Sequence, residues 1–148
     1  MAGDQSQAPF ADALAAMAGR DLVQLLVPGH AGSAAFYRAI EDGLARYGHG
    51  DVDGALADID VAIEEEPDDV RLREMKGLAL LVGKRTDEAK ATFDAALERS
   101  PDSADVLFQR GRLLASLGQA DGAMADLDKA IGLVPDAAEA LVLRARLH

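Results

Sequence analysis

The chain contains no cysteine and no tryptophan, and aromatic residues make up only 4% of its 148 residues. The lack of cysteine excludes a disulfide scaffold, thiolate metal sites and a cysteine nucleophile. No apolar run approaches the roughly 20 residues that cross a bilayer. No basic segment precedes an apolar core at the N-terminus, so we expect no secretory signal. A chain with these absences is typical of the reducing cytoplasm.

Positive charge is also scarce. Asp and Glu outnumber Lys and Arg by 26 to 15, and the formal net charge is −11. Such a chain repels phosphate backbones and anionic lipids, so we expect no nucleic-acid and no membrane partner. The expected partner is a protein or peptide with basic or apolar character. Apolar residues make up 49% of the chain, which is enough for a core, and the abundance of Ala and Leu favours helices.

A step of 34 residues recurs along the chain. It separates Pro67, Pro101 and Pro135. Four further columns keep the same step: Gly43, Gly77 and Gly111; Ala55, Ala89 and Ala123; Ile59, Phe93 and Leu127; and Ala62, Ala96 and Ala130. A repeat of this length predicts an array of one stacked supersecondary unit.

The segment 70–101 shows what one unit contains. Its first half carries a helical stripe formed by Leu72, Met75, Leu78, Ala79 and Val82, and its second half a stripe formed by Ala89, Phe93, Ala96 and Leu97. Small residues such as Gly77 allow two helices to cross closely. Pro101 ends the second helix because it forces Ser100 out of helical geometry. The predicted unit is a pair of antiparallel helices with a short turn.

These Gly, Ala, large apolar, Ala and Pro columns resemble the tetratricopeptide repeat family over residues 36–148. The resemblance implies an all-α, right-handed solenoid of three helix-turn-helix units, at 36–69, 70–103 and 104–137, with a C-terminal capping helix at 137–148. Residues 1–35 do not fit the repeat. We expect them to be partly disordered with a short helix, and either to cap the first repeat or to lie in a groove.

The resemblance also implies a protein–protein interaction module that binds a peptide or helix of a partner in a concave groove. The groove residues it implies are Tyr37, Ile40, Leu44, Tyr47, Arg71, Glu74, Leu78, Leu81, Asp105, Phe108, Arg112 and Arg146. The aliphatic ones have an alternative role in packing between repeats. One subfamily grips a peptide carboxylate with Lys and Asn, but the corresponding places here hold Ile40, Leu44, Met75, Asp105 and Gln109. We therefore expect no carboxylate clamp.

The acidic run from Asp51 to Asp60 does not fit a calcium loop. An EF-hand would need Gly and Glu where Leu56 and Ala62 stand. We expect Asp51 instead to cap the next helix, with Asp53 in its first turn. The chain has no histidine pair, no phosphate-binding glycine loop and no nucleophile elbow. We expect no metal site, no cofactor and no enzymatic activity.

The two ends leave alternatives open. Asp136 and Glu139 are spaced as in a capping box. The helix that follows is either a cap or a surface for self-association, which would give a homo-oligomer. At the other end, residues 8–32 weakly resemble the opening of the pyridoxal-phosphate-dependent ornithine/lysine/arginine decarboxylases. That resemblance implies a further alternative, a regulatory appendage of such an enzyme.

Overall fold

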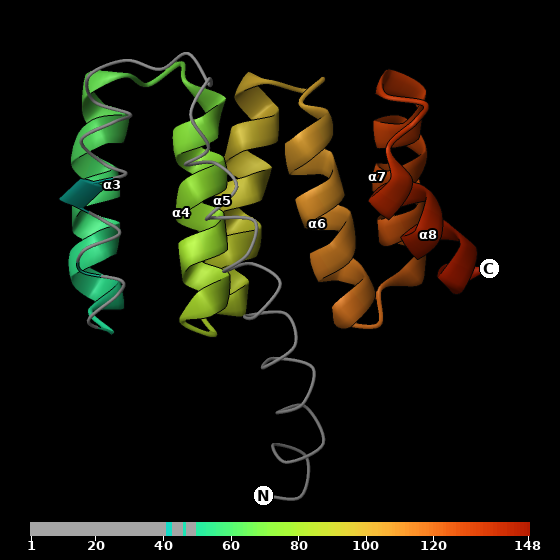
Figure 1. Ribbon diagram of the computed structural model, residues 1–148, viewed down its shortest axis with the longest axis horizontal. Helices are drawn as coiled ribbons and strands as arrows, with labels where there is room; N and C mark the ends of the chain where they lie inside the picture. Colours follow the sequence, from blue (N-terminus) through green and yellow to red (C-terminus); the bar gives the residue numbers. More distant parts are fainter. Residues whose placement is uncertain (1–40, 43–45, 47–49) are drawn as a thin grey trace, which may run out of the picture. The chain divides into compact units, whose positions relative to one another are not determined.

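The computed structural model describes residues 41–42, 46 and 50–148, and the chain divides into two compact units, residues 1–89 and 90–148. The helices are α3 (Val52–Glu65), α4 (Val70–Val82), α5 (Thr86–Arg99), α6 (Ala104–Ser116), α7 (Ala120–Leu133) and α8 (Ala138–Leu147) (Figure 1). No strand occurs among the described residues. The predicted all-α helical-repeat fold is confirmed. The expected N-terminal segment 1–35 lies outside the described residues, and the repeat boundaries stay a prediction.

The repeated prolines mark the end of every second helix. Helices α3, α5 and α7 each end two residues before Pro67, Pro101 or Pro135. The residue just before each proline still donates its N–H to a helical carbonyl: Glu66 to Ala62 at 2.9 Å, Ser100 to Ala96 at 2.9 Å and Val134 to Ala130 at 2.8 Å. Proline then stops the helix, as predicted, because it disfavours helical geometry in the residue before it.

The turn within each helix pair contains a residue of left-handed conformation. Gly50, Lys84 and Gly118 have φ angles of 78°, 62° and 79°, and they too are separated by 34 residues. The sequence indicated Gly83 as the glycine that ends α4. Gly83 does follow α4, but its φ is −77° and the left-handed residue is Lys84. A lysine therefore occupies the position where the other two turns have glycine.

Replacing Lys84 with glycine is expected to raise the free energy of unfolding by about 0.5–1 kcal/mol. The left-handed conformation brings Cβ close to a carbonyl oxygen, and glycine removes that contact. The matched control is Gly118→Ala, which introduces the same contact and should lower the stability by a similar amount. Urea unfolding followed by circular dichroism measures both. Equal midpoints for wild type and both variants would contradict this account.

In the second unit, α6 packs against α7 at a glycine. A Cβ placed on Gly111 would lie 3.2 Å from Cγ of Leu127 and 3.3 Å from Cβ of Asp126. Such contacts are tighter than most real ones, so the close approach of the two helices depends on glycine. Ala123, Leu127 and Ala130 on α7 are buried. The prediction that Gly111 lies against the Ala–Leu–Ala stripe of the next helix is confirmed at Leu127.

Three ion pairs recur with the same step of 34 residues, and we call them the repeat ion pairs. They join Asp60 to Lys76 at 2.8 Å, Asp94 to Arg110 at 2.9 Å and Asp128 to Arg144 at 3.2 Å. In each pair, the second helix of one repeat supplies the carboxylate and the first helix of the next supplies the cation. The helices α3 and α4, and likewise α7 and α8, pack side by side (Figure 1). The repeat therefore contains polar columns as well as apolar ones.

Arg110 on α6 has a second carboxylate partner. Its Nε and Nη2 donate to Asp126 on α7, each at 2.7 Å, while its Nη1 donates to Asp94 on α5 at 2.9 Å. The hydrogen bond to Asp126 raises the pKa of the Arg110 guanidinium in spite of its partial burial. Burial of Asp94 would raise its pKa, but the hydrogen bonds from Lys90 and Arg110 lower it below its ordinary value. One guanidinium thus connects three helices.

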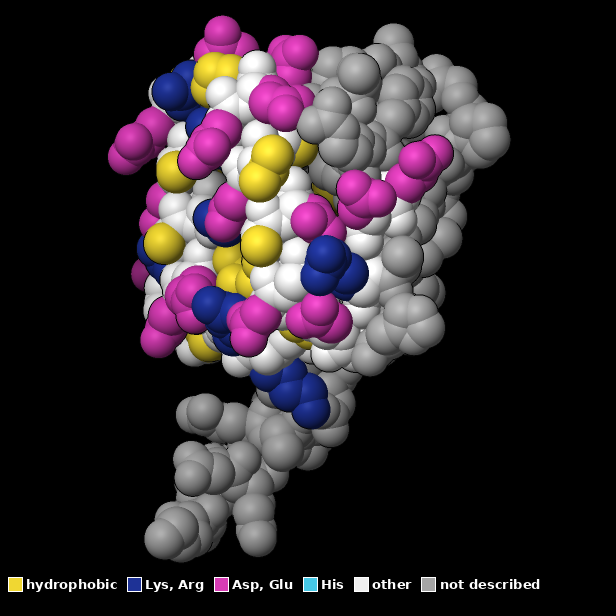
Figure 2. All heavy atoms as spheres, turned by 90° about the vertical axis from the view of Figure 1, so that its left-hand side faces the viewer, with side chains coloured by type: hydrophobic (Ala, Val, Ile, Leu, Met, Phe, Trp, Pro, Cys, Tyr) yellow, Lys and Arg dark blue, Asp and Glu magenta, His cyan; other side chains and the backbone are white. Residues whose placement is uncertain are grey.

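The acidic run that starts at Asp51 is used for helix capping. The Asp51 side chain accepts the backbone N–H of Gly54 at 2.9 Å, and Asp53 lies in the first turn of α3. The predicted capping role is confirmed. Exposed carboxylates continue along α3 at Asp53, Asp60, Glu64 and Glu65. Figure 2 shows the face on the α3 side, where acidic side chains are spread among Lys, Arg and hydrophobic ones.

Within the described part of the chain, no helix is both long enough and apolar enough to cross a bilayer.

Candidate functional site

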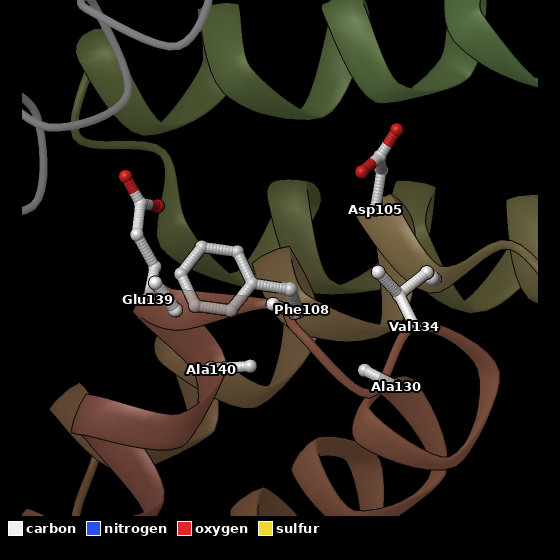
Figure 3. A pocket seen from close by; sticks show the side chains of 9 residues that line it. Asp105, Phe108, Ala130, Val134, Glu139 and Ala140 are labelled. Carbon is white, nitrogen blue, oxygen red and sulfur yellow. The ribbon is translucent and has the colours of Figure 1, made fainter.

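A cavity of about 330 Å³ opens in the second unit, beside the first turns of α6 and α8 and the C-terminal end of α7. Its volume lies at the low end of the range for ligand pockets. Figure 3 shows six of its lining residues labelled. The full lining is Ala104, Asp105, Phe108, Ala130, Val134, Ala137, Ala138, Glu139 and Ala140.

The walls of the cavity are mainly apolar. Alanine occupies five of the nine lining positions, and these small side chains leave the space that the cavity fills. Val134, which follows α7, is 40% exposed. In the view of Figure 3, the Phe108 ring lies between the carboxylates of Asp105 and Glu139. An aromatic surface and two acidic groups are thus presented together.

The two carboxylates at the cavity lie in the first turns of their helices, Asp105 in α6 and Glu139 in α8. Both residues are exposed. Neither forms an ion pair with any other described residue. Negative charge is favourable at a helix N-terminus. The site is therefore an apolar cavity with an acidic rim.

The predicted capping box at Asp136 and Glu139 is wrong. The N-cap of α8 is Ala137, and it makes no side-chain capping hydrogen bond. The N–H of Ala137 donates to the carbonyl of Val134 at 3.1 Å, so the turn continues past Asp136 and the helix begins one residue later than a box would require. Glu139 consequently does not cap the helix, and its side chain lines the cavity.

The structure brings together three of the predicted groove residues. Asp105 and Phe108 line the cavity, and the guanidinium carbon of Arg112 lies 5.4 Å from the centroid of the Phe108 ring. Arg112 is only 5% exposed, and it donates to the side-chain oxygen of Gln109. A cation over an aromatic face is attracted by the ring. Arg112 therefore supports Phe108 from within the helix bundle.

The other predicted groove residues lie elsewhere. Arg71 on α4 is held by Asp69, with Nε to Oδ1 at 3.1 Å and Nη2 to Oδ2 at 3.0 Å. Glu74, Leu78 and Leu81 on α4 are buried, and Arg146 on α8 is exposed. The remaining four are outside the described residues: Tyr37, Ile40, Leu44 and Tyr47. The role of all these residues in a groove stays a prediction.

Sequence reasoning missed Glu139 and Val134 as lining residues. A signal for Glu139 was present, because it follows Asp105 by one step of 34 residues, as Ala138 follows Ala104. Extending the groove positions by that step predicts an acidic pair on α6 and α8. Val134 and Ala130 belong to the end of α7, which the groove positions on the first helices did not include.

In the described part of the chain, no group of three or more histidine or acidic side chains is placed to hold a metal ion. The carboxylates at the cavity therefore provide charge and hydrogen-bond acceptors for whatever enters it.

Helix pairs of one length, repeated glycine–alanine contacts and a cavity beside successive first helices define a helical-repeat protein. The family model "Tetratricopeptide repeat" matches residues 40–104 and 84–138, which together cover more than half of the chain. The chain belongs to the tetratricopeptide repeat family. No curated protein sequence matches it.

Solved structures of tetratricopeptide repeats share the fold. The TPR2B domain of yeast Sti1, solved in a pHsp70 complex, has a TM-score of 0.67 and 20% identity, over 78% of this chain and 97% of that one. The second such domain of human RPAP3, in complex with the HSP70 peptide SGPTIEEVD, has a TM-score of 0.65 and 17% identity, over 75% and 92%. YrrB, described as having an unusual peptide-binding site, has a TM-score of 0.63 and 26% identity, over 78% of this chain and 58% of that one.

Proposed function

We propose that this chain is a non-enzymatic protein–protein interaction module, and that it binds a peptide or helix of a partner protein at the cavity beside α6 and α8. The observation that carries the proposal is the cavity of about 330 Å³, which presents the Phe108 ring and Val134. Aromatic side chains next to arginine, as in Phe108 and Arg112, are typical of the centres of protein interfaces.

Two further features support this proposal. The first helices of successive repeats, α6 and α8, contribute to one cavity, so a partner that follows the repeat contacts both. The structural neighbours Sti1 and RPAP3 were solved with Hsp70 or an Hsp70 peptide, so peptide binding is one use of this fold. Because the RPAP3 peptide SGPTIEEVD is acidic and the cavity here carries two carboxylates, we propose a different class of peptide for this chain.

The proposal predicts that Phe108→Ala weakens peptide binding by about tenfold or more, because it removes the largest apolar surface of the cavity. The measurement is selection of a random peptide library, displayed on phage, on the immobilised full chain, followed by fluorescence anisotropy with the enriched peptides. Leu117→Ala is the matched control, since Leu117 is 43% exposed, follows the other end of α6 and does not line the cavity.

Circular dichroism establishes that both variants fold. If the folded Phe108→Ala variant binds the enriched peptides as tightly as wild type does, or if wild type enriches none, this function is wrong for the site.

Self-association is a second candidate, because Val142 on α8 is 53% exposed and is an apolar surface on the last helix described. Light scattering over a dilution series separates the two candidates: a mass that stays at that of one chain rules out self-association. The segment that resembles the decarboxylases, residues 8–32, lies outside the described residues, and a regulatory link to such an enzyme stays a prediction.

A further inference from the structure

We propose that the cavity holds the side chain of a lysine or arginine of the partner, so that the recognised segment is basic and carries apolar residues beside the basic one. This inference rests on the proposed function and names the chemistry of the residue bound at that site. It follows from the charge of the rim, from the shape of the walls and from the position of Arg112.

The rim carries negative charge that nothing in the described part of the chain neutralises. Asp105 and Glu139 have no ion-pair partner there, whereas Asp126 and Asp128 of the same unit each pair with an arginine. A neutral group that entered the cavity would remove water from the two carboxylates without replacing its hydrogen bonds, which is unfavourable. A cation instead supplies charge-assisted hydrogen bonds to them.

The walls suit the stem of a long basic side chain. Ala130, Ala140 and Val134 present methyl groups inside the rim, and Phe108 adds the surface of its ring. Lysine and arginine pack their methylene groups along apolar surface while the charged end reaches a polar or hydrated group. An apolar wall below two carboxylates matches that division. An acidic side chain has neither the stem nor the charge for this site.

Arg112 limits what the Phe108 ring contributes. Its guanidinium already lies 5.4 Å from the ring centroid, and the residue is buried and bound to Gln109. A second cation over the ring therefore gains little from cation–π attraction. Recognition of the partner's charge falls to Asp105 and Glu139, which leave the site negative because they outnumber the single guanidinium beside it.

A structural role for the two carboxylates has to be separated from binding. Acidic residues in the first turn of a helix stabilise the helix itself. Asp121 provides the comparison, because it lies in the first turn of α7 and is exposed but does not line the cavity. Asp121→Asn removes one first-turn charge of the same kind and leaves the acidic rim unchanged.

The test repeats the selection from the phage-displayed random peptide library on the full chain, with wild type and with the double variant Asp105→Asn/Glu139→Gln. We expect wild type to enrich peptides that share a lysine or arginine at one position next to apolar residues. We expect the double variant to bind peptides without that preference. The variant Asp121→Asn is expected to keep the preference of wild type.

An enriched peptide is then synthesised twice, once with its basic residue and once with norleucine, which keeps the stem and lacks the charge. Wild type and Asp121→Asn should bind the norleucine peptide about tenfold more weakly, and the double variant should bind both peptides about equally. Peptides enriched through Phe108 without a common basic residue, or equal binding of both peptides by wild type, would overturn this inference and leave the proposed function standing. A basic preference that persists in the double variant would also overturn it, and no enrichment at all overturns both.

Discussion

Replacing Arg110 with methionine is expected to lower the free energy of unfolding by about 2–3 kcal/mol. Asp126, whose side chain is 8% exposed, would lose both hydrogen bonds from the guanidinium and remain as a charge with little access to water. Removing one member of a buried ion pair is strongly destabilising for that reason. Urea unfolding at neutral pH, followed by circular dichroism, measures the loss.

The double variant Arg110→Met/Asp126→Leu provides the control. It removes the charge that the single variant strands and fills the space with apolar groups, so it should recover most of the lost stability. Asp94 is more exposed and keeps its hydrogen bond from Lys90 at 3.0 Å. A double variant that is less stable than Arg110→Met would show that the damage comes from packing and not from an unpaired carboxylate.

The contribution of Arg110 should also depend on pH. The pKa of Asp94 is lowered in the folded state, since the hydrogen bonds from Lys90 and Arg110 outweigh the effect of its burial. A lowered folded-state pKa contributes stability above the unfolded value of about 3.9, and that stability is lost as the pH falls through the folded-state value. The difference in stability between wild type and Arg110→Met should therefore be full near neutral pH and shrink below about pH 4.

Replacing Gly111 with leucine is the second large effect that we expect, a loss of about 3 kcal/mol. Its Cβ alone would stand 3.2 Å from Leu127 and 3.3 Å from Asp126, and the remaining atoms have no space between α6 and α7. Overpacking of this kind forces side chains from their rotamers and moves the backbone. Thermal and urea unfolding of the variant check this value.

Gly132 on α7 is the matched control for Gly111. A Cβ at Gly132 meets nothing within 4 Å, so Gly132→Leu gains the helix propensity that glycine lacks and should raise the stability by about 0.5–1 kcal/mol. Gly111→Ala lies between these cases, because its gain in propensity is offset by the tight contacts. If Gly111→Leu and Gly132→Leu have the same stability, the close crossing of α6 and α7 does not depend on Gly111.

The fold could be predicted because its apolar columns appear in the sequence with a fixed step. Proline ends α3, α5 and α7, and Gly111 lies against Leu127, for reasons that act between residues close in the chain or one repeat apart. The repeat ion pairs could be found in the same way but were not sought, because charged residues are spread over the whole surface and most of them do not repeat. Lys84 was missed because turns of left-handed conformation usually show a glycine.

The site could be predicted only in part. Asp105 and Phe108 follow from the face of one helix, and they do line the cavity. Val134 comes from the end of another helix, and its exposure depends on how α7 and α8 pack, which the period alone does not define. Glu139 was assigned to a capping box, because the spacing of Asp136 and Glu139 agrees with one. A shift of one residue in the start of α8 decided between the two roles.

The repeat ion pairs have a consequence for how such a chain lengthens by duplication. Each 34-residue segment carries a carboxylate near the end of one helix and a cation in the first helix, so a copy inserted at a repeat boundary would meet the right partner on both sides. No compensating substitution at the new junctions would be needed for these contacts. The joint between modules is thus encoded inside the module itself, and the array can gain or lose a copy without a mismatch of charge.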